Sequence, residues 1–101
     1  MDERQPRYAI AECVVTGYAP WGILVTTDAG RHGWVAAEYL ADGTIRRDEW
    51  PAVGTRLTGV VLGYTHAGRI RLATIPSYVA ALRDSTDPAA AARLWAAERR
   101  H

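Results

Sequence analysis

Several residue types are absent from this chain or nearly so, and their absence excludes some kinds of protein. The 101 residues contain no lysine, asparagine or phenylalanine and only one cysteine, Cys13. One cysteine cannot form a disulfide within the chain, so we expect Cys13 to be a small core residue. No apolar run approaches the ~20 residues of a membrane helix, and the first residues, MDERQPRY, are charged. We therefore expect a cytoplasmic protein with no membrane partner.

Positive charge is not in large excess either. Twelve arginines stand against eleven acidic residues, which gives a formal net charge of +1. A dedicated nucleic-acid binder usually carries a clear excess of positive charge, so any such attraction must come from local clusters of arginine. Because 49% of the residues are hydrophobic, the chain can bury a core, and its length fits one small domain.

No pattern typical of catalysis is present. No serine, cysteine or carboxylate stands beside a histidine in a recognisable arrangement, and the glycines are scattered singly rather than forming a phosphate-binding loop. His32 and His66 lack a third ligand at a known metal-binding spacing. The sequence predicts no enzyme, no metal and no cofactor.

Alternation of apolar and polar residues predicts five short strands. A turn is expected at 28–33, a hairpin turn at 66–68, and a long connection at 37–55 with one helical turn near Ala37 to Leu40. Five strands with a long third connection favour a small closed barrel, because closure removes exposed sheet edges. The expected strands are residues 8–18, 23–27, 34–36, 56–65 and 69–75.

The pattern becomes helical after Pro76. Residues 77–84 form one expected helix, and a second begins where Asp87 can cap the free amides and Pro88 fits the first helical position. Arg99 and Arg100 are expected in its last turn, where the helix dipole favours positive charge. We divide the chain into a flexible N-terminus (1–7), a barrel (8–76) and a C-terminal helical extension (77–101).

The extension carries an apolar stripe that must be buried, either on the barrel or on another chain. If its second helix left its large apolar side chains exposed, they would form an interaction surface for a protein partner. The residues of the stripe are Val79, Leu82, Leu94 and Trp95.

Three stretches carry a resemblance to a known family: PWGILV (20–25), GWVAAEYL (33–40) and VGTRLTGVVLGYTHAGRIRL (53–72). In order and spacing they resemble the RNA-binding domain repeated in ribosomal protein S-one, which also occurs in polynucleotide phosphorylase and several exoribonucleases. The match extends over about residues 9 to 75. The resemblance implies a five-stranded OB-fold barrel that binds single-stranded RNA. With the helices expected after Pro76, we predict a mainly β protein, a five-stranded OB-fold barrel with a C-terminal α-helical extension.

The family binds RNA through two aromatic rings, a histidine, a polar residue and an arginine. The first ring matches Trp21, and the arginine matches Arg69, with Arg71 on the same strand face. The other three positions depart from the family pattern and hold Leu24, Ala36 and Thr65. The RNA-binding residues that the resemblance implies are Trp21, Leu24, Arg69 and Arg71.

Two functions remain open. One is a small protein that binds single-stranded RNA weakly and with little sequence preference, as an accessory to translation or RNA turnover. The other is a protein-interaction module on a barrel that has lost nucleic-acid binding, with contacts through the C-terminal helices or a Trp21–Leu24 patch. Trp21 is either exposed to a base or buried against these helices. We assign Trp34, Trp50 and Tyr64 to the core or the barrel seam.

Overall fold

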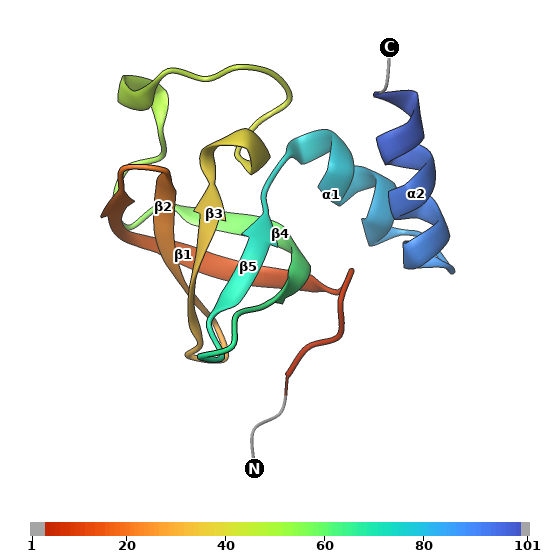
Figure 1. Ribbon diagram of the computed structural model, residues 1–101, viewed down its shortest axis with the longest axis horizontal. Coiled ribbons are helices and arrows are strands. Elements are labelled where there is room, and N and C mark those ends of the chain that lie inside the picture. Colours follow the sequence, from red (N-terminus) through yellow and green to blue (C-terminus); the bar gives the residue numbers. More distant parts are fainter. Residues whose placement is uncertain (1–3, 100–101) are drawn as a thin grey trace.

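Five strands close into a barrel in the computed structural model, which describes residues 4–99 (Figure 1). The order around the barrel is β1-β2-β3-β5-β4, and β4 returns to pair with β1. All neighbours are antiparallel except β3 and β5, which are parallel. The predicted OB-fold barrel with a helical extension is thus confirmed. The strands are β1 (Ile10–Ala19), β2 (Gly22–Thr27), β3 (His32–Ala36), β4 (Arg56–Tyr64) and β5 (Ile70–Ala73).

The barrel interior is filled by alternate residues of every strand, as the sequence pattern predicts. In β1, Ala11, Cys13 and Val15 point inward, and a bulge between Val15 and Gly17 shifts the register with β2. Branched aliphatic side chains dominate the centre, because they pack well on a pleated surface. The largest fully buried ones inside the barrel are Val15, Ile23, Val25, Val35, Val61, Ile70 and Leu72.

Two glycines permit the strands around β3 to approach closely. A Cβ atom on Gly33 would lie 2.0 Å from the carbonyl oxygen of Ile70, across the parallel β3–β5 contact. A Cβ atom on Gly22 would lie 2.2 Å from the carbonyl oxygen of Val35. No side chain fits at such distances, so the closure of the barrel depends on glycine at these positions.

The long connection between β3 and β4 contains two short 3-10 turns, η1 (Ala37–Tyr39) and η2 (Arg47–Glu49). The first confirms the helical turn expected there. After the second, Trp50 packs against the barrel core, and the Tyr18 hydroxyl donates to the carbonyl of Pro51 at 2.8 Å. The connection is thereby held against the end of the barrel.

Two helices follow the barrel, α1 (Pro76–Arg83) and α2 (Pro88–Glu98). The expected cap is confirmed: the Asp87 carboxylate accepts a hydrogen bond from the Ala90 amide at 3.2 Å. Arg99 follows the last turn of α2 and pairs with Asp42 at 2.6 Å, whereas Arg100 lies outside the described residues.

The apolar stripe of the extension packs on the barrel with one exception. Val79 and Leu82 are buried in a second core cluster, which also contains Val60 of β4 and Ala73 of β5. Trp95 is partly buried and packs against this cluster. The inclusion of Leu94 is wrong, because this side chain is 63% exposed. Ala92 is buried instead, and residues two positions apart on a helix do not share a face.

Cys13 offers a simple test of the barrel core. Its side chain is fully buried, and burial, followed by the nearby Glu12 carboxylate, raises the pKa of the thiol to about 11. Because the thiolate is the reactive species, we expect no reaction with Ellman's reagent at neutral pH while the protein is folded. Absorbance of the released thiolate should rise only when denaturant is added. Rapid labelling of the folded protein would contradict this burial.

Among residues 4–99, no helix is long and apolar enough to cross a membrane. Within the same range, no group of three histidine, cysteine, aspartate or glutamate residues is placed to hold a metal ion.

Candidate nucleic-acid interface

The helices cover one side of the barrel and leave another side open. The outward-facing residues Ile10, Val60 and Ala73 are neighbours in register and lie in or against the helix-packed core cluster. A different row crosses β2, β3 and β5, in which Leu24 pairs with Trp34 and Trp34 pairs with Arg71. We define the open face as this row together with Trp21 and Arg69.

Trp21 lies at the bend between β1 and β2 and is 46% exposed. Its ring meets the ring of Trp34 edge to face, with centroids 5.0 Å apart and planes at 73°. This geometry is a favourable aromatic contact. Trp21 therefore packs on the barrel surface with much of its ring accessible, and the alternative in which it is buried against the C-terminal helices is wrong.

Trp34 is the residue that sequence reasoning missed. We assigned it to the core or the seam, but it is only partly buried and lies on the open face. Its neighbours Gly33 and Val35 point inward, so alternation along β3 turns the Trp34 ring outward. That alternation in Gly-Trp-Val was the available signal. Trp50 and Tyr64, by contrast, pack against the core as predicted.

The positions that depart from the family pattern have ordinary structural surroundings. Leu24 is partly buried beside Gly17, and Ala36 stands opposite Gly22. The Thr65 hydroxyl accepts a hydrogen bond from the Arg69 amide at 3.1 Å and so supports the hairpin turn. None of these residues adds an aromatic ring or a charge to the open face.

Arg69 and Arg71 are exposed, while Ile70 and Leu72 between and after them are buried. The predicted alternation of β5 is therefore confirmed. Within residues 4–99, neither guanidinium makes an ion pair or a side-chain hydrogen bond. Some other arginines are paired with carboxylates, as Arg56 is with Asp28 at 2.8 Å. The open face thus carries two cations that are available to an anionic partner.

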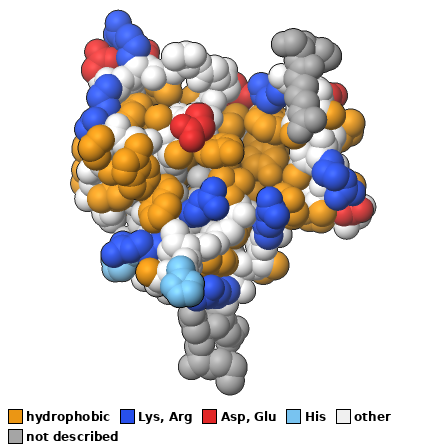
Figure 2. Space-filling model, viewed as in Figure 1, with side chains coloured by type: hydrophobic (Ala, Val, Ile, Leu, Met, Phe, Trp, Pro, Cys, Tyr) orange, Lys and Arg blue, Asp and Glu red, His pale blue; other side chains and the backbone are white. Residues whose placement is uncertain are grey.

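The edge of the open face at the end of β2 and the start of β3 is also polar. The Nδ1 atom of His32 lies 3.0 Å from the Thr26 hydroxyl, and Arg31 donates to the carbonyl of Gly68 at 2.8 Å. Figure 2 shows hydrophobic side chains gathered over the β2–β3 side, with arginine and histidine side chains beside and below them. This combination of rings and cations is suited to the bases and phosphates of a nucleic acid.

Solved structures with a similar fold include one from Bacillus subtilis and two from Pyrococcus species. GSP13 from Bacillus subtilis has a TM-score of 0.67 at 22% identity, covering 87% of this chain and 69% of that one. The alpha subunit of aIF2 from Pyrococcus abyssi has a TM-score of 0.66 at 15% identity, covering 75% of this chain and 31% of the subunit. A chain of the a/eIF2alpha-aDim2p-rRNA complex from Pyrococcus horikoshii has a TM-score of 0.64 at 18% identity, covering 96% of this chain and 55% of that one.

No protein-family model and no curated protein sequence matches this chain. At identities of 22% or less, the structural neighbours establish the fold and leave the function to be argued from the side chains.

Proposed function

We propose that the open face binds single-stranded RNA weakly and with little sequence preference. The observation that carries this proposal is the contact of the exposed Trp21 ring with the partly buried Trp34. Trp34 is in register with Arg71, which has no anionic partner within residues 4–99. Unpaired bases stack on aromatic rings regardless of their identity, and arginine neutralises the neighbouring phosphates.

The composition of the face argues for modest affinity and little base selection. Leu24 and Ala36 offer no hydrogen-bonding side chain, and sequence is distinguished mainly through hydrogen bonds to base edges. The net charge of +1 adds little long-range attraction. Two structural neighbours are named as the alpha subunit of aIF2 and a chain of an a/eIF2alpha-aDim2p-rRNA complex. We accordingly propose an accessory role in translation or RNA turnover.

The direct test is a titration with a short oligouridylate at low salt, followed by fluorescence anisotropy. Trp21→Ala should lower the affinity about 5- to 150-fold, which corresponds to about 1–3 kcal/mol for a stacked base. Arg71→Ala should weaken binding and reduce the slope of log K against log salt by about 0.7, because one phosphate contact is lost.

Arg83→Ala is the matched control. It removes the same charge from α1, where the Arg83 guanidinium faces Glu12 at 3.9 Å, away from the open face. Its affinity should equal that of the natural chain. If the natural chain binds no oligouridylate at low salt, the RNA proposal is wrong. The barrel is then better explained as the protein-interaction module, whose apolar contacts would be insensitive to salt.

A further inference from the structure

A groove lies between the barrel and α2, and none of its lining residues belongs to the open face. It has a volume of about 280 Å³ and is bordered by the N-terminal segment, η1, β4 and both helices. Figure 2 shows hydrophobic side chains between the barrel and the helices. The lining residues are Arg7, Tyr8, Tyr39, Leu62, Tyr78, Ala92, Arg93, Trp95 and Ala96.

The groove is unusually aromatic. Tyr78 and Trp95 are in contact, with ring centroids 4.6 Å apart. Tyr8 and Tyr39 line the same groove. Burial, followed by Tyr8, raises the pKa of Tyr78, while Arg7 opposes this shift. None of the three hydroxyls makes a hydrogen bond within residues 4–99. They are available to the polar edge of a planar ligand.

The charge of the groove is positive. No carboxylate is among the nine lining residues, and both arginines are exposed. The Arg7 guanidinium lies 5.0 Å from the Tyr8 ring centroid. Arg93 makes no ion pair and no side-chain hydrogen bond in the described part of the chain. Aromatic rings bordered by such cations favour a planar ligand that carries negative charge.

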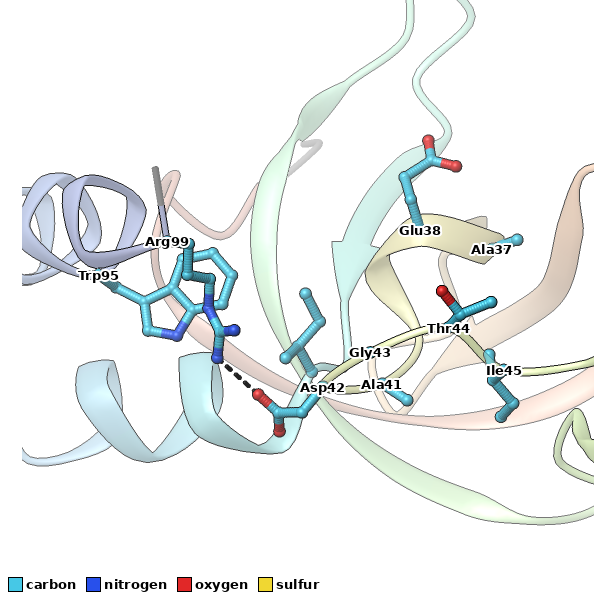
Figure 3. A pocket seen from close by; sticks show the side chains of 10 residues that line it. Ala37, Glu38, Ala41, Asp42, Gly43, Thr44, Ile45, Trp95 and Arg99 are labelled. Carbon is cyan, nitrogen blue, oxygen red and sulfur yellow. Dashed lines mark hydrogen bonds and ion pairs between the residues drawn. The ribbon is translucent and has the colours of Figure 1, made fainter. Parts of the chain in front are cut away.

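A second cavity, of about 510 Å³, lies on the other side of Trp95 and does not share this charge (Figure 3). There the Arg99 guanidinium stacks 4.1 Å from the Trp95 ring centroid but is neutralised by Asp42, and Glu38 also lines the cavity. The Trp95 indole N–H donates to the Ser77 hydroxyl at 3.0 Å. These contacts fix the orientation of Trp95 beside the aromatic groove.

We propose that the aromatic groove binds a nucleobase and the adjacent phosphate of the same single-stranded RNA that crosses the open face. This inference rests on the proposed function. The base would stack on Tyr8 and Tyr39 beside the edge of Trp95, and Arg7 and Arg93 would contact the phosphate. The helical extension then lengthens the RNA site beyond the barrel itself.

Oligonucleotide length separates this inference from the proposed function. An oligouridylate of about four nucleotides should reach the open face alone, whereas one of about twelve should also reach the groove. Arg93→Ala should lower the affinity for the longer oligomer about three- to tenfold and leave the shorter unchanged. Arg83→Ala, with the same change in charge, should alter neither.

Two results would overturn the inference while leaving RNA binding on the open face intact. One is equal affinity of Arg93→Ala and the natural chain for the longer oligomer. The other is an indole N–H signal of Trp95 in the NMR spectrum that does not move with the longer oligomer although the Trp21 signal does. If the natural chain binds neither oligomer, the proposed function itself has failed.

Discussion

Replacing Gly33 by alanine should remove more than about 3 kcal/mol of folding stability, because the new methyl group has no space. Its carbon would lie 2.0 Å from the Ile70 carbonyl oxygen and 2.4 Å from Ile70 Cγ2. Relief requires β3 and β5 to separate, which breaks the parallel pairing of Gly33 with Ile70 that closes the barrel. Since small domains are stable by only about 5–15 kcal/mol, this loss should lower the midpoint of urea denaturation markedly.

Gly17→Ala is the matched control for this experiment. The added carbon would lie 3.5 Å from Leu24 Cδ1, an ordinary contact distance. Its stability should change by less than about 1 kcal/mol. Urea denaturation followed by circular dichroism compares the two variants. Equal midpoints for Gly33→Ala and Gly17→Ala would show that the β3–β5 contact is looser than described.

Replacing Trp34 by alanine should weaken RNA binding more than replacing Trp21. Trp34 supports the Trp21 ring edge to face and stands between Leu24 and Arg71 in register. Its loss removes a stacking surface and also the support that positions its neighbours. We expect a larger loss of affinity than for Trp21→Ala, toward the upper end of the about 5- to 150-fold range that corresponds to about 1–3 kcal/mol for a stacked base.

A double-mutant cycle tests whether the two rings act together. If Trp34 positions Trp21, the combined Trp21→Ala and Trp34→Ala variant should lose less binding energy than the sum of the single losses. Trp34→Phe retains a smaller ring and should recover part of the affinity. Thermal denaturation of each variant confirms that the barrel is folded. Strict additivity, or natural affinity in Trp34→Ala, would contradict a shared binding surface.

Local sequence patterns were sufficient to predict the barrel. Alternation fixed the inward and outward residues of β5, and the Asp87-Pro88 pair marked the start of α2. The same rule applied to β3 would have placed Trp34 outside. It was missed because a large aromatic residue beside a glycine and a valine was assigned to the core by residue type. Leu94 was wrong for a different reason: helical spacing placed it on one face with Ala91 and Trp95, but the helix docks with Ala92 buried and Leu94 exposed.

Other features depend on contacts between distant segments and have no local signal. The aromatic groove joins Tyr8, Tyr39, Tyr78 and Trp95, which come from four separate parts of the chain. The contact of Arg99 with Asp42 spans 57 positions. The groove and the Arg99–Asp42 contact could not be predicted from local sequence, because they form only when the helices pack on the barrel.

The order of pairing in the barrel has a consequence for a chain that is still being synthesised. β1, β2 and β3 are consecutive and can pair as soon as they emerge, but their two outer strands stay unpaired until β4 meets β1 and β5 meets β3. Ile10 can pair only after Val60 has been synthesised, and Gly33 can pair on this side only after Ile70 has been synthesised. Exposed strand edges are templates for association between chains. The long connection before β4 therefore sets the interval during which a nascent chain most needs protection from its neighbours.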